Sequence, residues 1–252
     1  MGIVPYFTPS RLEIIYAPVA AELSRQLDGR VDFRTATSFD KYFWKLKDQD
    51  FDIALVHPLY YVPAVDQFDY VPLVRMLEPF KALIVVPQDS PIQKTSDLKG
   101  KIIATPPTHL PAVHLARSAL KQAGLNEQDD VIFMAMKTVD ACLQRMLSGS
   151  AHACVAPPFA ANAFQSSSGA NLRTILETVE LPNLTFVVHK RVPESERARI
   201  KAAMLAWNDT ANGQKLLKKI KTRRFIPAED RDYDQVRRFV LSLGEAWLPS
   251  NP

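Results

Sequence analysis

The chain has 252 residues, which is enough for one large domain or two medium-sized domains, each with its own hydrophobic core. Hydrophobic residues make up 47% and charged residues 23%, so disordered, collagen-like and coiled-coil proteins are excluded. The formal net charge is +4, and the one dense basic segment is 218–224 (KKIKTRR). No aromatic residues interleave these cations as a base-stacking platform requires. We interpret the segment as a solvated helix face with a bias toward anions, and expect no nucleic-acid partner.

From the sequence as it stands we expect neither a membrane span nor an export signal. No apolar run approaches the roughly 18 residues that a spanning helix needs, so we expect no direct membrane insertion. The chain opens at Met1 and Gly2 directly in a strand-like segment, GIVPY. This start fits a cytoplasmic protein, or an exported protein whose signal has been replaced by a start methionine, and the residues alone do not separate the two.

Strand and helix patterns alternate over the first eighty residues. Predicted strands occupy 2–5, 31–36, 51–56 and 70–74. A helical stripe at 10–28 contains Pro18, which predicts a kink or break near Ala17. Ser38 can cap a second helix. The alternation favours a mainly parallel sheet between helices.

The alternation resumes after an apolar run at 82–86. A strand at 101–105 leads into a loop with three prolines and then into a helix from about Leu110, which Gly124 ends. Further α/β units follow, and the run LTFVV at 184–188 repeats the character of ALIVV at 82–86. We therefore predict an α/β fold of two lobes joined by two hinge strands, each lobe a mainly parallel sheet flanked by helices. Lobe I comprises 1–85 and 184–252, and lobe II comprises 86–183.

The two cysteines, Cys142 and Cys154, form no CxxC pair, which excludes a zinc ribbon and a thioredoxin motif. Cys142 lies on the apolar stripe of a predicted helix and Cys154 lies in the strand-like run 152–156. We interpret both as buried, inert thiols. A disulfide that ties the helix to the strand is the alternative.

The sequence lacks the common catalytic and cofactor motifs. It has no GxGxxG, GxxxxGK[ST], HExxH or GxSxG, and its five histidines are scattered. A metal held by His57, His109 and Cys154 is a minor alternative. We expect a protein that is not an enzyme and has no catalytic residue, cofactor or metal.

Candidate ligand-binding residues follow the predicted strands, because strand-to-helix loops face the ligand in open α/β folds and helix N-termini offer unpaired N–H groups. His109 can pair with an anion when protonated. Of the adjacent Tyr60 and Tyr61, we expect Tyr61 to point at the ligand. The predicted site comprises Tyr6, Phe39, His57, Tyr61, Thr105, Thr108, His109 and Pro157.

Several segments, in order along nearly the whole chain, resemble one known family. FDIALVHPLYYV is similar to a strand followed by a GPLxYV motif, with His57 in place of the usual glycine. IVVPQDSPIQKTSDLKGKIIA matches a hinge strand and its "DSPI…DLKGK" continuation, and FIPAEDRDYDQVR resembles a C-terminal signature. These are features of the phosphate/phosphite/phosphonate-type periplasmic solute-binding proteins of ABC transporters.

The resemblance implies the type II periplasmic-binding-protein fold, which traps a small ligand between two lobes by hinge closure. It also implies a permease partner and a periplasmic location after removal of an export signal. We expect a monomer. The alternatives are a ligand-sensing module of the same fold that signals to a receptor, and, less favoured, an enzyme on a similar two-lobed fold. The enzyme hypothesis requires a convergent acid/base pair, for which we find no motif.

The chain departs from this family at the ligand. Where phosphonate binders carry a Ser-Thr-Ser/Ala cradle, this sequence has His109, Leu110 and Pro111, and proline offers no N–H. The family's histidine falls on Val139 and a tyrosine on Phe39. Each missing donor in a buried anion site costs about 1–3 kcal/mol. The resemblance thus implies a phosphonate- or phosphate-like oxyanion with altered specificity, or alternatively an apolar-tailed or weakly charged ligand.

Overall fold

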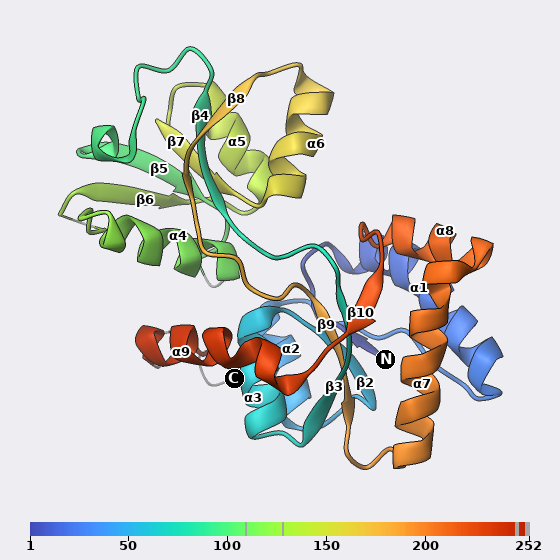
Figure 1. Cartoon of the computed structure of the whole chain (residues 1–252). Helices are drawn as coiled ribbons and strands as arrows, with labels where there is room; N and C mark the ends of the chain where they lie inside the picture. The colour runs from blue at the N-terminus through green and yellow to red at the C-terminus, as the bar shows by residue number, and fades with distance from the viewer. Residues whose placement is uncertain (109, 128, 245–246, 250–252) are drawn as a thin grey trace. The chain divides into compact units, whose positions relative to one another are not determined.

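The computed structural model describes residues 1–108, 110–127, 129–244 and 247–249. The chain forms two compact units, which Figure 1 shows in the colours of the sequence. Unit 1 combines Met1–Pro79 with Leu181–Pro252, and unit 2 is Phe80–Glu180. The predicted lobe boundaries lay slightly further along the chain, at 85/86 and 183/184. The difference arises because the first crossing strand, Leu83–Pro87 (β4), pairs with strands of unit 2 along its whole length.

The described part of unit 1 contains a five-stranded sheet in the order β1-β2-β9-β3-β10. The strands are Gly2–Ile3 (β1), Ile53–Val56 (β2), Tyr70–Met76 (β3), Thr185–His189 (β9) and Phe225–Pro227 (β10). β1 pairs in parallel with β2, whereas β9 pairs antiparallel with β2 and β3, and β10 pairs antiparallel with β3. Every residue of β2 and β9 is buried, as expected for central strands covered on both faces.

Helices cover both faces of this sheet (Figure 1). α1, α7 and α8 share one apolar core with β1, β2 and β9, whereas α2, α3 and α9 lie on the opposite face. The helices are Pro9–Leu27 (α1), Phe39–Lys47 (α2), Pro58–Asp66 (α3), Glu194–Ala206 (α7), Ala211–Lys219 (α8) and Asp234–Leu243 (α9). Two short 3₁₀ turns, Trp207–Asp209 (η2) and Asp230–Tyr233 (η3), precede α8 and α9.

The described part of unit 2 contains a second five-stranded sheet, in the order β6-β5-β7-β4-β8. β5, β6 and β7 run in parallel, and β4 is antiparallel to both β7 and β8. α5 and α6 pack with β4 and β7 in one apolar core, and α4 lies on the other face. The elements are Leu83–Pro87 (β4), Thr95–Leu98 (η1), Lys101–Thr105 (β5), Pro111–Gln122 (α4), Val131–Ala135 (β6), Val139–Leu147 (α5), Ala153–Ala156 (β7), Pro158–Ser168 (α6) and Leu172–Glu177 (β8).

The two-lobed α/β fold is confirmed, with three corrections of detail. Both sheets are mixed, because β9 runs antiparallel to β2 and β3 in unit 1, and β4 runs antiparallel to β7 and β8 in unit 2. The predicted strand at 31–36 is wrong, since it is reduced to one bridge between Gly2 and Arg34. The predicted break near Ala17 is also wrong, and α1 continues through Pro18. The carbonyl that loses its amide donor there belongs to Ile14, whose side chain is 73% exposed, so water can reach that turn.

The two cysteines form a disulfide, so the interpretation as free thiols is wrong. Cys142 of α5 and Cys154 of β7 have their Cα atoms 5.8 Å apart, and both side chains are fully buried. The bond fixes α5 to the sheet in the middle of the unit 2 core. No helix within the described residues combines the length and apolar character that a bilayer span requires.

Candidate functional site

In unit 1, the loops after β1 and β2 leave the sheet at the same edge because the two strands are parallel neighbours. Tyr6 follows β1. Its hydroxyl shares a 2.8 Å hydrogen bond with the hydroxyl of the fully buried Tyr16, and its ring lies 4.7 Å from that of Phe7. Burial raises the pKa of Tyr6 to about 12. The phenol is therefore neutral at physiological pH.

His57 follows β2 and caps α3. Its side chain is 5% exposed, and its Nδ1 accepts a hydrogen bond from the backbone N–H of Tyr60 at 3.3 Å. The imidazole ring lies 3.9 Å from the Tyr60 ring and 5.9 Å from the ring of Phe39, the first residue of α2. The Tyr60 hydroxyl donates to the Phe39 carbonyl at 3.3 Å. Two of the predicted residues, Phe39 and His57, thus belong to one aromatic cluster.

Tyr61 lies in the interior of unit 1. Its side chain is fully buried and stacks on Tyr233 with ring centroids 3.4 Å apart. Its hydroxyl donates to a carboxylate oxygen of Asp230 at 3.0 Å, and the same carboxylate accepts from Arg237 at 2.6 Å. Burial and the neighbouring carboxylate raise the pKa of Tyr61 well above its usual range. The hydroxyl therefore already has a strong internal partner.

In unit 2, Thr105 ends β5. The residue is fully buried, and its hydroxyl has no hydrogen-bond partner among the described residues. A buried hydroxyl without a partner costs free energy, and such groups in native proteins usually mark a place where water or a ligand binds. Thr105 is thus the predicted residue whose surroundings depart most from an ordinary structural role.

The loop from β5 to α4 contains two further predicted residues. Thr108 is exposed in a turn, and His109 lies outside the described residues. α4 begins with Leu110 as its N-cap and Pro111 in its first turn, and the Leu110 side chain makes no capping hydrogen bond. The Val113 N–H is directed back to the Leu110 carbonyl at 3.0 Å. This helix start therefore offers fewer amide donors than an ordinary one.

Pro157 follows β7, the parallel neighbour of β5, so its loop leaves the sheet at the same edge as Thr105. It is buried as the N-cap of α6, and its carbonyl accepts from the N–H groups of Ala160 and Ala161. The adjacent Phe159 is 54% exposed although it is a large apolar residue. At this sheet edge, unit 2 thus places an exposed aromatic ring and a buried hydroxyl for which the described residues provide no partner.

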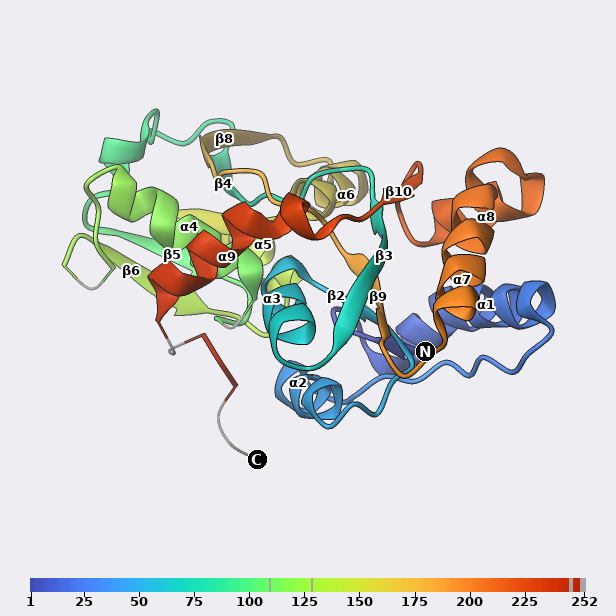
Figure 2. The same ribbon diagram turned by 60° about the horizontal axis from the view of Figure 1, so that its bottom comes forward.

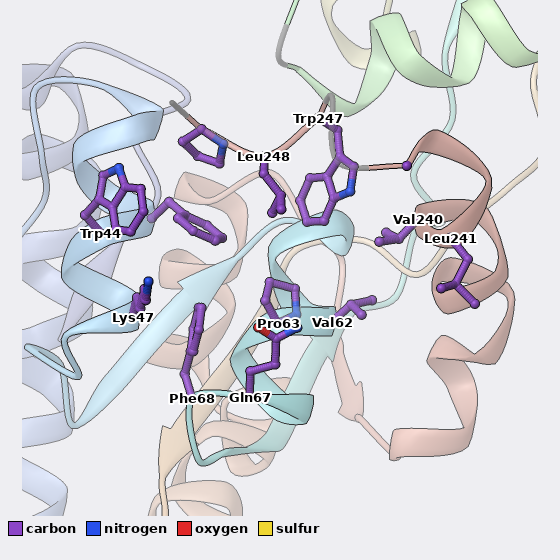
Figure 3. A pocket seen from close by; sticks show the side chains of 13 residues that line it. Trp44, Lys47, Val62, Pro63, Gln67, Phe68, Val240, Leu241, Trp247 and Leu248 are labelled. Atoms are coloured by element: carbon purple, nitrogen blue, oxygen red, sulfur yellow. The ribbon is translucent and has the colours of Figure 1, made fainter. Parts of the chain in front are cut away.

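Unit 1 also contains an apolar groove of about 610 Å³ (Figure 3). Its walls come from α2, α3, α9 and the segment 247–249, with Trp44, Phe68 and Trp247 directed toward the hollow. Trp247 is 7% exposed, and its ring lies 6.5 Å from that of Tyr60. No predicted site residue lines this groove, so it is separate from the candidate ligand-binding residues.

Sequence reasoning missed one residue near these positions, Asp230, and left Phe159 and Tyr60 out of the predicted site. Asp230 accepts the hydrogen bond of the Tyr61 hydroxyl although the two residues are 169 positions apart in the sequence. No local sequence pattern could have predicted this contact. The ring of Phe159 was expected at the ligand because it follows the strand that ends at Ala156. Tyr60, rather than Tyr61, contacts His57. Cys154 is bonded to Cys142, which removes it from the minor metal-site alternative.

Solved structures share this fold. PhnD1 from Prochlorococcus marinus in complex with methylphosphonate has a TM-score of 0.80 at 18% identity and covers 97% of each chain. A binding-protein component of a phosphonate ABC transporter from Pseudomonas aeruginosa has a TM-score of 0.80 at 12% identity, covering 96% of this chain and 84% of its own. The periplasmic aliphatic sulphonate-binding protein SsuA from Escherichia coli has a TM-score of 0.71 at 14% identity, covering 100% and 92%.

No curated protein sequence matches the chain significantly. The family model described as "ABC transporter, phosphonate, periplasmic substrate-binding protein" matches residues 1–233, which is most of the chain. This match agrees with the two-unit α/β fold and with the order of the segments along the sequence. The chain therefore belongs to the family of periplasmic substrate-binding proteins of phosphonate ABC transporters.

Proposed function

We propose that this chain works in the periplasm as the ligand-binding component of an ABC transporter, and that its ligand is a small phosphonate-like oxyanion with an apolar or aromatic group. The family match over residues 1–233 is the observation that carries the proposal. The buried disulfide supports the location, because such bonds form and persist in oxidising compartments.

The oxyanion would be held by unit 2. Parallel β5, β6 and β7 are followed by α4, α5 and α6, so three helix N-termini lie at one sheet edge and present positive partial charge there. Thr105 adds a buried hydroxyl that has no hydrogen-bond partner among the described residues. The prolines in the first turns of α4 and α6 remove amide donors, so the affinity for a bare oxyanion should be lower than an amide-rich cradle would give.

The apolar part of the ligand would be recognised by aromatic rings. Unit 1 places Tyr6, Phe39 and His57 after its strands or at the start of a helix, and unit 2 exposes Phe159. Burying an aromatic group of this size contributes about 1.5–3 kcal/mol, or roughly 10–100-fold in affinity. This binding free energy is large enough to offset the N–H donors that the prolines of α4 and α6 remove.

A ligand panel tests the proposal. Native mass spectrometry of the purified protein would look for a carried ligand, and thermal unfolding would be measured with phosphate, phosphite, methylphosphonate, phenylphosphonate and benzoate. A ligand at about a hundred times its dissociation constant adds about 2.7 kcal/mol of stability. We expect phenylphosphonate to bind at least about tenfold more tightly than phosphate. If none of the phosphorus oxyanions stabilises the protein, the proposal of a phosphonate-like ligand is rejected.

Thr105→Val tests the site within that panel. The variant keeps the shape of the side chain and removes only the hydroxyl. Because this hydroxyl has no partner in the part of the chain that the structure describes, stability without ligand should not fall. Affinity for the oxyanion should fall about tenfold or more, since a hydrogen bond to a charged group contributes about 1.5–3 kcal/mol. Equal affinity of Thr105→Val and wild type would remove Thr105 from the site.

Thr178→Val is the matched control in unit 2. The Thr178 hydroxyl accepts from the Ala82 N–H at 3.0 Å and donates to the Val179 carbonyl at 3.1 Å. The control should therefore lose about 1–3 kcal/mol of stability while ligand affinity stays unchanged. The two variants thus separate a ligand contact from a structural one.

A further inference from the structure

Six cationic side chains gather where α8 turns into β10, at the edge of unit 1. They are Lys215, Lys218, Lys219, Lys221, Arg223 and Arg224, and all six are exposed. The sequence has no Asp or Glu between Asp209 and Glu229, so this stretch is basic without internal compensation. We call these six residues the α8 basic surface. α8 lies beside α1 and the end of α7 in both views of the molecule (Figures 1 and 2).

The α8 basic surface is more than one face of a helix. Lys221 adopts a left-handed backbone conformation, with φ 63°, which turns the chain sharply from α8 toward β10. Two of the helix cations and one of the turn cations are thereby brought around one hollow of about 430 Å³. This hollow is lined by Gln214, Lys215, Lys218, Thr222 and Arg223.

The backbone beneath these cations is firmly held. Leu217 and Ile220 of the helix are buried in the unit 1 core. The side chain of Asn208 exchanges two hydrogen bonds with the backbone of Phe225, at 2.8 and 2.9 Å. The Thr222 hydroxyl donates to Glu78 at 2.7 Å. The charges therefore keep their spacing, and no ordering of the backbone is needed before they act together.

Few of these charges are neutralised within the protein. Arg223 forms an ion pair with Glu78 at 2.8 Å. The other five cations make no ion pair with any side chain that the structure describes. Like charges held this close repel one another, and an external anionic surface relieves that repulsion.

We propose that the α8 basic surface docks this protein on an anionic phospholipid membrane. Four of the six cations are lysines, whose flexible point charges suit the diffuse negative charge of lipid headgroups better than the directional geometry of one carboxylate partner. No aromatic residue interleaves the cations, which disfavours single-stranded nucleic acid. Such docking would keep the protein close to a membrane-embedded partner without inserting a segment into the bilayer.

Vesicle co-sedimentation tests the proposal with the whole chain. Vesicles containing about one-third phosphatidylglycerol should bind the protein at about 0.05 M salt, vesicles of pure phosphatidylcholine should not, and about 0.5 M salt should abolish binding because the charges are then screened. Each lysine near an anionic surface raises binding about fivefold. Lys215→Gln, Lys218→Gln and Lys219→Gln together should therefore weaken vesicle binding by at least about tenfold.

The matched control removes the same charge elsewhere. Lys41→Gln, Lys121→Gln and Arg238→Gln replace exposed cations that likewise have no ion pair among the described residues. This variant should keep its vesicle binding, and both triple variants should keep the wild-type melting temperature. If the two triple variants lose vesicle binding to the same extent, binding depends only on net charge, and the proposal is overturned.

Two further outcomes also overturn it. Binding to phosphatidylcholine and phosphatidylglycerol vesicles alike would show that charge is not what is recognised. No binding to anionic vesicles, together with α8-dependent binding to a purified permease in phosphatidylcholine, would assign the surface to an acidic protein partner instead. Ligand affinity is measured separately, so failure of the ligand proposal leaves this test unaffected.

Discussion

Reduction of the Cys142–Cys154 disulfide should destabilise unit 2 by about 3 kcal/mol. The two cysteines are 12 positions apart, and cross-linking a loop of this length removes about 10 cal/mol/K of chain entropy from the unfolded state, or about 3 kcal/mol at 25 °C. Both sulfur atoms are fully buried among apolar side chains, so the reduced thiols can stay in place without a large change in packing. The loss should therefore come mainly from the unfolded state.

Thermal unfolding with and without reductant measures this effect. A chain of this size loses about 2–4 °C of melting temperature per kcal/mol, so reduction should lower the transition by roughly 6–12 °C. The double variant Cys142→Ala with Cys154→Ala is the control, because its melting temperature should not respond to reductant. Thiol titration of the unfolded protein gives the redox state independently.

Two results would refute this reasoning. One is the titration of two free thiols in protein purified from an oxidising compartment. The other is a melting temperature that reductant leaves unchanged although titration shows that the bond has been broken. The second result would mean that the denatured state is already restrained near these two residues.

Three further predictions concern stability. Gly213→Ala should destabilise unit 1 severely, because the added Cβ would lie 2.2 Å from the backbone of Trp207. Gly29→Ala is the control and should be nearly neutral, because no atom lies closer than 3.7 Å to its added Cβ. Urea denaturation compares the free energy of unfolding of the two variants. Burial lowers the pKa of His189 in the folded protein. Stability should therefore fall as the pH drops below about 6.5, which is the pKa of histidine in the unfolded chain. In unfolding measurements, His189→Gln should make the free energy of unfolding less dependent on pH in this range. Tyr61→Phe removes a hydroxyl that donates to a carboxylate, and should lower the free energy of unfolding by about 1.5–3 kcal/mol while ligand affinity in isothermal titration stays within about twofold.

The alternation of apolar runs and helical stripes was sufficient to predict the two-lobed α/β fold. Each strand of the pattern carries its own local signal, as the fully buried β2 and β9 illustrate. The direction of β9 relative to β2 carries no such signal, because it is set by where the chain returns to the sheet. The predicted strand at 31–36 alternates correctly in sequence, but only one residue finds a partner strand.

The candidate site shows the same limit more sharply. Thr105 could be placed at a strand end from its neighbours in sequence, and the structure adds that its hydroxyl is buried without a described partner. The partner of Tyr61 could not be foreseen, because Asp230 reaches it only after the chain has passed through unit 2 and returned. Cys142 and Cys154 were likewise identifiable as buried. The distance of 5.8 Å between their Cα atoms, however, depends on how α5 packs on the sheet.

Prolines at the helix starts can change ligand preference without changing the fold. α1, α3, α4 and α6 each have a proline in the first turn, a position where the ring fits the helix but removes an N–H. The helix dipoles remain, since they arise from the whole helix, but directional donors for anionic oxygens are fewer. A ligand that depends on many amide contacts would therefore lose more here than one that combines a single oxyanion with an aromatic body. The proline-containing helix starts should therefore affect the ratio of phenylphosphonate to phosphate affinity more than either affinity alone.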